Sequence, residues 1–230
     1  LSTNTPHSAN PFLFKKLNYD PVKDFAAVAR MIYYEFILVV NASSGIKTVP
    51  ELINYVKANP GKTSYAIGNS TGQVNGAYFV SAARLDSLPV PYKSTPPAMT
   101  DLIAGQTQYM FVDAASSQGH VKTGRLRAIA VMSDKRSGVT PDLPAVGETV
   151  PGFDTVPWAG MFAPAGTPKA VITRLNSEIV KAINKPAIHQ RLAEIGLQPA
   201  PSTPAELDQM VKEQLAAWGK KIRDAGIQPE

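Results

Sequence analysis

The alternation of short strands and helices between Thr63 and Met132 most narrowly limits how this chain can fold. Short apolar, β-branched stretches alternate there with amphipathic stretches, and only a few residues connect them. The expected strands are 63–67, 88–92, 108–112 and 126–132, and the expected helices are 73–84, 98–104 and 115–123. This pattern predicts a mostly parallel sheet with helices on its faces.

Three polar loops follow the carboxyl ends of these strands. They are residues 68–72, 93–97 and 113–117. Ligands of open parallel sheets bind beyond the carboxyl ends of the strands. We therefore expect the three loops to share one rim and to contribute to one binding site.

The first loop has the sequence Gly-Asn-Ser-Thr-Gly and leads from a strand into a helix expected to begin at Gln73. Backbone N–H groups at a helix start, the positive end of the helix dipole and the side chains of Asn69, Ser70 and Thr71 favour a small anion such as a carboxylate. A plainer interpretation is that Gly68 and Gly72 only allow a turn with positive φ.

The two ends of the chain are expected to form a separate lobe. Three helices predicted near the C-terminus lack a sheet of their own, so their apolar faces must pack on strands from elsewhere. The last of them is expected to begin with a capping box formed by Thr203 and Glu206. We assign residues 1–40 and 156–230 to a first lobe, and residues 41–155, with crossover segments, to a second. Residues 1–10 are turn-rich, and their place in the chain favours a frayed terminus.

Composition narrows the function classes further. The 230 residues include no cysteine and three isolated histidines, so we expect neither a metal site nor a cofactor. The net charge of +5 comes from scattered lysines and arginines rather than basic runs, which argues against nucleic acid as a partner.

Several motifs spread along the chain resemble one known family. They are YDPVKDF at 19–25, ANPGK at 58–62, VPYK at 90–93, GRLRA at 124–128 and APAGTP at 163–168. Together, in this order and at these spacings, they resemble the periplasmic solute-binding receptors of tripartite tricarboxylate transporters, the Bug family. The similarity covers essentially the whole chain.

The resemblance implies a type II periplasmic-binding-protein fold of class α/β, with two lobes that each contain a doubly wound sheet. It implies a periplasmic, non-enzymatic monomer that closes on a small organic carboxylate and delivers it to membrane transporter subunits. Family members carry a signal peptide and a further segment with a Gly-Gly loop before the part that resembles Ser2 to Pro11. We therefore expect the first lobe to be incomplete in this chain.

The resemblance also assigns candidate ligand-binding residues, in addition to Asn69 of the first polar loop. They are Thr3, Asn4, Thr5, Ser70, Thr71, Gly72, Ser94, Thr95 and Asp113. The first three match a polar ligand loop of the first lobe, so the resemblance replaces the frayed-terminus interpretation of residues 1–10. Asp113 has a plainer alternative, because an aspartate before a helix can simply cap it. If Asp113 instead faces the ligand, it repels carboxylate and selects an amine or hydroxyl group. We expect Tyr92 and Trp158 to be packing residues.

The same loop supports a rival function. Gly-Asn-Ser-Thr-Gly at 68–72 fits the G-x-S-x-G pattern of a serine hydrolase, with Ser70 as nucleophile. A hydrolase needs a histidine within reach of that serine and an acid behind it. His120 and His189 lie in expected helices, and no glycine-rich oxyanion segment precedes the loop. We therefore expect no catalytic residues; a purely structural or interaction role is the third possibility.

Overall fold

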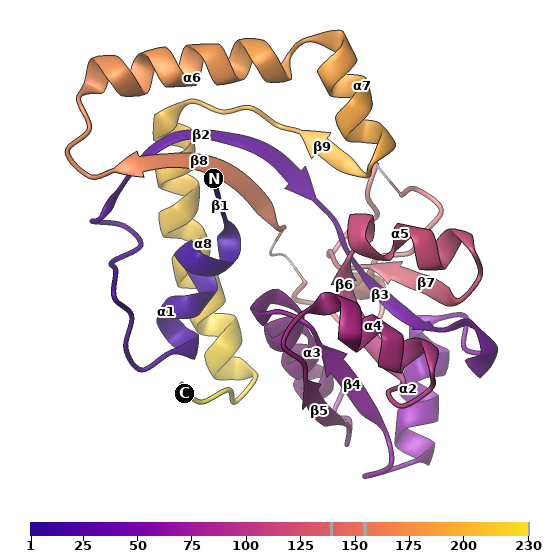
Figure 1. Cartoon of the computed structure of the whole chain (residues 1–230). Helices are drawn as coiled ribbons and strands as arrows, with labels where there is room; N and C mark the ends of the chain where they lie inside the picture. Colours follow the sequence, from indigo (N-terminus) through magenta and orange to yellow (C-terminus); the bar gives the residue numbers. More distant parts are fainter. Residues whose placement is uncertain (139, 154–155, 230) are drawn as a thin grey trace. The chain divides into compact units, whose positions relative to one another are not determined.

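A computed structural model describes residues 1–138, 140–153 and 156–229, and these form two compact units (Figure 1). Unit 1 comprises the described residues of Leu1–Tyr34, Thr155–Ile222 and Gln228–Glu230. Unit 2 comprises those of Glu35–Asp154 and Arg223–Ile227. Segments from both ends of the chain therefore lie in unit 1.

Unit 2 is built on a five-stranded sheet of order β5-β4-β6-β3-β7. Its strands are β3 (Phe36–Asn41), β4 (Ser64–Ile67), β5 (Leu88–Pro91), β6 (Tyr109–Asp113) and β7 (Leu126–Val131). Strand β4 is parallel to both β5 and β6, whereas β3 runs antiparallel to its neighbours β6 and β7. The predicted mostly parallel sheet is therefore confirmed, with β3 as the antiparallel member.

Helices cover both faces of this sheet. Successive side chains of β6 point to opposite faces and so contact helices on both of them. The helices are α2 (Val49–Ala58), α3 (Ser70–Ala82), α4 (Thr95–Ile103) and α5 (Ala114–Lys122), with short helical turns η2 (Ala42–Ser44) and η3 (Val146–Glu148). Phe111 of β6 packs edge-to-face on Phe79 of α3. Met110 and Val112, which point the other way, pack in a buried cluster with Met99 of α4.

Unit 1 contains a four-stranded sheet of order β1-β8-β2-β9. Its strands are β1 (Ser2–Thr3), β2 (Phe25–Tyr34), β8 (Trp158–Pro164) and β9 (Leu197–Pro199). Its helices are η1 (Thr5–Ala9), α1 (Asn10–Leu13), α6 (Lys169–Ile183), α7 (Pro186–Glu194) and α8 (Pro204–Asp224), whose last two residues fall in unit 2. Helix α6 runs along one face of the sheet and α8 along the other (Figure 1).

Two expectations about unit 1 need correction. All neighbouring strands of its sheet pair antiparallel, so the sheet is not doubly wound as expected. The reason is the position of β2. Strands β8 and β9, which α6 and α7 connect, run parallel to each other, but β2 lies between them and runs the opposite way. The unit boundary lies at residue 34 rather than 40, because β3 pairs with β6 and β7 of unit 2. Residues 1–10 form β1, η1 and the start of α1, which agrees with the structured loop that the resemblance implies there and not with a frayed end.

Local capping signals are reproduced where the sequence shows them. Thr203 and Glu206 form the expected capping box of α8: each backbone N–H donates to the other residue's side chain, at 2.8 and 3.2 Å. None of the described helices combines the length and the apolar character needed to cross a bilayer.

Candidate functional site

The carboxyl ends of β4, β5 and β6 meet at one edge of the unit 2 sheet. Ile67 at the end of β4 pairs with Pro91 at the end of β5, and Ala66 pairs with Met110 on β6. The loops that follow these three strands therefore leave from the same edge. Ser70, Ser94 and Asp113 lie on this edge, which we call the unit 2 rim (residues 68–72, 92–95 and 113).

Helix α3 begins at Ser70, three residues earlier than expected, because Asn69 caps it. Asn69 has an extended backbone, and its Oδ1 accepts a 2.8 Å hydrogen bond from the Gly72 N–H. Ser70, Thr71 and Gly72 thus form the first helical turn rather than a loop. The Ser70 N–H at such a position has no acceptor within the helix, and the helix dipole favours negative charge in front of it.

The glycines of this loop are needed for close approach rather than for positive φ. Neither is among the glycines with positive φ. A Cβ on Gly68 would lie 2.6 Å from Thr95 Cα, and one on Gly72 would lie 2.8 Å from the Phe111 carbonyl oxygen. The alternative that these glycines only permit a left-handed turn is therefore wrong. Gly68 lets the loop after β4 touch the loop after β5.

Ser94 and Thr95 stand at the start of α4, which also begins three residues earlier than expected. Ser94 occupies the N-cap position, but its side chain makes no capping hydrogen bond. The Asn69 Nδ2 donates to Thr95 Oγ1 at 3.4 Å. This contact brings the first two loops together at the start of α4.

Asp113 caps α5, as its plainer alternative predicts. Its Oδ1 accepts a 2.8 Å hydrogen bond from the Ser116 N–H. Within the described part of the chain the second carboxylate oxygen has no hydrogen-bond partner, and the side chain is half-buried. Capping therefore uses one oxygen of Asp113 and leaves the other at the rim.

Unit 1 has a rim of its own at the carboxyl ends of β1 and β2. Both strands flank β8, where Ala159 pairs with Thr3 on one side and with Ile32 on the other. Thr3 is the last residue of β1, and Asn4 and Thr5 follow it. Asn4 is fully buried, and its Oδ1 accepts a 3.0 Å hydrogen bond from the Tyr34 hydroxyl. Sequence reasoning missed Tyr34, since no local motif links it to Asn4.

Asn75 is a buried polar residue close to the start of α3. It lies in the second turn of α3 and is fully buried. Its Nδ2 donates to the Thr71 carbonyl at 2.8 Å, and among the described residues its Oδ1 has no partner. This buried acceptor without a donor is visible only in the structure, and no sequence pattern indicates it.

Both aromatic residues expected to be packing residues have structural partners. Trp158 is fully buried, and its Nε1 donates to Gln214 Oε1 at 2.8 Å. The Tyr92 hydroxyl donates to Asp101 Oδ2 at 2.8 Å. Desolvation and this carboxylate raise the pKa of Tyr92 to about 12, so the phenol stays protonated.

Among the described residues, Ser70 has no hydrogen bond to a histidine of the kind that a serine hydrolase needs. His120 lies in the last turn of α5, and His189 lies in α7 of unit 1. No hydrogen bond joins Ser70 to a histidine within residues 1–138, 140–153 and 156–229. In the same residues no three His, Cys, Asp or Glu side chains are grouped as metal ligands would be.

Comparisons with known proteins agree with this architecture. A family model described as "Tripartite tricarboxylate transporter family receptor" matches residues 1–227. A UPF0065 protein from the tcbD-tcbE intergenic region of Pseudomonas sp. strain P51 is 34% identical over 215 residues. That match covers 92% of this chain and 64% of the relative, so the chain spans less than two-thirds of the relative's length.

Three solved structures share the fold. Rpa4515 of R. palustris with adipate is 29% identical, with a TM-score of 0.93, over 100% of this chain and 78% of that one. The periplasmic binding protein BugD is 29% identical, with a TM-score of 0.88, over 99% and 78%. MatC from Rhodopseudomonas palustris with bound malate is 27% identical, with a TM-score of 0.83, over 96% and 77%. The predicted α/β fold of periplasmic binding proteins is confirmed.

Proposed function

The chain belongs to the family of tripartite tricarboxylate transporter receptors, and from this premise we propose that it is a non-enzymatic receptor for a small organic carboxylate. The resemblance inferred from the sequence motifs is thereby confirmed at the level of the family. Two structural neighbours are described with a dicarboxylate, adipate or malate. We propose the same class of ligand here.

The contact between Asn69 and Thr95 carries this proposal, because it joins two polar helix starts on the unit 2 rim. The first turn of α3 offers backbone N–H groups to an anion. Helix α4 offers mainly the hydroxyls of Ser94 and Thr95, because Pro96 and Pro97 have no N–H. The proposed ligand-binding residues in this unit are Asn69, Ser70, Thr71, Gly72, Ser94, Thr95 and Asp113. Thr3, Asn4 and Thr5 are the proposed contribution of unit 1.

Magnitudes favour several weak donors over one strong group. A helix terminus contributes about 0.3–1 kcal/mol, and a hydrogen bond to a charged group about 1.5–3 kcal/mol. A micromolar dissociation constant corresponds to about 8 kcal/mol after the cost of ordering the partners. No single loop reaches this value, so the proposal requires several of these residues at once.

We further propose that the receptor works in the periplasm as a monomer and hands its ligand to membrane transporter subunits. The family and the name of the neighbour BugD, a periplasmic binding protein, support this assignment. Fractionation of the native host and light scattering of the purified protein test the location and the oligomeric state.

Calorimetric titration with di- and tricarboxylates, amino acids and aromatic acids tests the receptor function. We expect saturable binding of at least one dicarboxylate. The competing serine hydrolase predicts turnover of ester substrates and covalent labelling of Ser70 by a fluorophosphonate. Labelling together with no binding replaces the receptor by the hydrolase, and silence in both assays favours a structural or interaction role.

A further inference from the structure

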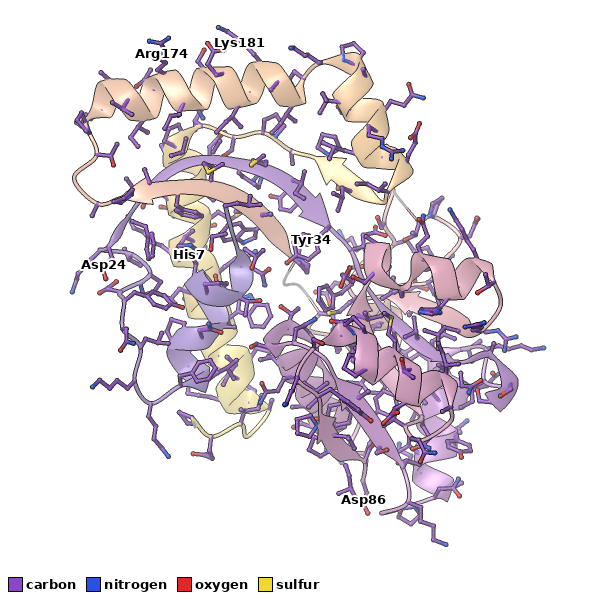
Figure 2. All side chains as sticks on the ribbon, in the orientation of Figure 1. His7, Asp24, Tyr34, Asp86, Arg174 and Lys181 are labelled. Atoms are coloured by element: carbon purple, nitrogen blue, oxygen red, sulfur yellow. The ribbon has the colours of Figure 1, made fainter. Side chains whose placement is uncertain are left out.

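Tyr34 links the candidate ligand loop of unit 1 to the point where the chain leaves that unit. It is the last residue of β2 and the last residue of this segment of unit 1 (Figure 2). Its backbone N–H donates to the Pro157 carbonyl at 3.1 Å, on the segment by which the chain re-enters unit 1. Its hydroxyl donates to Asn4 Oδ1 at 3.0 Å. One residue thus contacts both features.

The Asn4 amide carries an unused hydrogen-bond donor. Its side chain is fully buried, its oxygen is occupied by Tyr34, and within the described residues its Nδ2 has no acceptor. A buried donor without an acceptor loses its hydration without compensation, so an acceptor that reaches it is bound more tightly. An anionic oxygen is the strongest such acceptor.

The orientation of this donor depends on Tyr34. A free asparagine side chain can turn its amide over and exchange the positions of oxygen and nitrogen. Because the Tyr34 hydroxyl donates to Oδ1, the amide is held with its nitrogen on the opposite side. Asn4 follows β1 and Tyr34 ends β2. Because both strands run antiparallel to β8, which lies between them, the two residues lie at the same edge of the unit 1 sheet.

We propose that Tyr34 is a positioning residue for ligand recognition: its hydroxyl fixes the Asn4 amide so that the Asn4 Nδ2 donates to a carboxylate oxygen of the ligand. The inference rests on the proposed carboxylate receptor and extends it. It assigns to Asn4 the role of a donor that selects an anionic oxygen over an ammonium group. It also gives Tyr34 an indirect role, since its hydroxyl contacts Asn4 and Asn4 contacts the ligand.

Three variants test the inference by titration with adipate and with malate. Tyr34→Phe removes the hydroxyl but keeps the ring, and we expect it to weaken binding about five- to tenfold. Asn4→Asp keeps an acceptor for Tyr34 but replaces the donor with a negative charge, and we expect a loss of at least about tenfold. Adding Tyr34→Phe to Asn4→Asp should cause little further loss, because both changes act on one contact.

The neighbouring Tyr33 provides a matched control. Its hydroxyl contacts the Arg30 Nη1 at 2.6 Å and the Met210 Sδ at 3.7 Å rather than Asn4. Tyr33→Phe therefore removes a tyrosine hydroxyl from the same strand, and its affinity should match that of the wild type. Equal weakening by Tyr33→Phe and Tyr34→Phe contradicts a specific role for Tyr34.

A spectroscopic measurement without ligand separates this inference from the proposed function. In the ¹⁵N spectrum, Asn4→Asp identifies the side-chain NH2 signals of Asn4 by their loss. Tyr34→Phe should shift these signals, and Tyr33→Phe should not. Unshifted signals in Tyr34→Phe, or wild-type affinity in that variant, overturn the inference alone. A wild type that binds no carboxylate overturns the proposed function instead.

Discussion

The side-chain amide of Asn69 lies 3.4 Å from the hydroxyl of Thr95 and so joins the helix starts that follow β4 and β5. The same amide caps α3 through its oxygen, which accepts the Gly72 N–H at 2.8 Å. One residue therefore both begins the helix and orders the neighbouring loop. Changes at Asn69 should separate these two roles.

Asn69→Ala removes both contacts and should lower the free energy of unfolding by about 1 kcal/mol, the usual contribution of an N-cap. Carboxylate binding should fall as well. Asn69→Asp keeps the cap but puts a negative charge on the rim, so stability should be retained while binding is lost. Urea unfolding and calorimetry measure the two effects. Retained binding in Asn69→Asp would remove this residue from the site.

Asp113→Asn tests whether the free carboxylate oxygen of Asp113 faces the ligand. Asparagine caps helices as well as aspartate does, so the free energy of unfolding should change little. The range of bound acids should shift away from those that carry an amine and toward plain dicarboxylates. Asp113→Ala is the control, with a stability loss of about 1 kcal/mol. An unchanged ligand profile in Asp113→Asn would leave capping as the whole role of Asp113.

Gly68→Ala should disrupt the rim because its Cβ would lie 2.6 Å from Thr95 Cα and 3.0 Å from the Met110 methyl carbon. Backbone must move, so we expect a stability loss of about 1–3 kcal/mol and weaker binding. Gly119→Ala is the matched control, since nothing lies within 4 Å of its added Cβ in α5. The free energy of unfolding of Gly119→Ala should rise by about 0.5–1 kcal/mol. Equal changes in stability and binding for Gly68→Ala and Gly119→Ala would show that the close contact with Thr95 is not the reason for glycine at position 68.

His7 should make the stability of unit 1 depend on pH. It lies on η1 (Figure 2), is 1% exposed and stacks on Phe162 with ring centroids 4.0 Å apart. Burial lowers the pKa of His7 below 6.5, although its hydrogen bond to the Pro21 carbonyl acts in the opposite direction. The folded protein therefore binds this proton less tightly than the unfolded chain. The contribution of His7 to stability is complete above pH 6.5 and is lost as the pH falls below that value.

The measurement is the free energy of unfolding of the wild type and of His7→Phe between about pH 5 and pH 8. Phenylalanine keeps the ring stack and removes the titration. The difference between the two proteins should vary with pH by at most about 1.4 kcal/mol per unit, the limit for one proton. A pH-independent difference would contradict a buried neutral His7.

Local patterns predicted the parts of the fold that local physics determines. The alternation from Thr63 to Met132 identified the strands and the faces of unit 2, and Thr203 with Glu206 identified the start of α8. The position of β3 between β6 and β7 depends on distant partners, so its apolar run did not show which unit it joins. For the same reason, the expected boundary fell inside β3.

The candidate site was predicted less completely. The loops of the unit 2 rim were found because they follow predicted strands. The early starts of α3 and α4 were missed, because they depend on contacts that only the folded chain provides, such as Asn69 with Thr95. The hydrogen bond between Tyr34 and Asn4 joins residues 30 positions apart and has no local signature.

A crystal structure of the protein with adipate or malate tests the central claim most directly. We predict that one carboxylate of the ligand lies within hydrogen-bonding distance of the first turn of α3, at Ser70, with Thr95 beside it. Clear ligand density away from the unit 2 rim, or a covalent adduct on Ser70, would contradict the account.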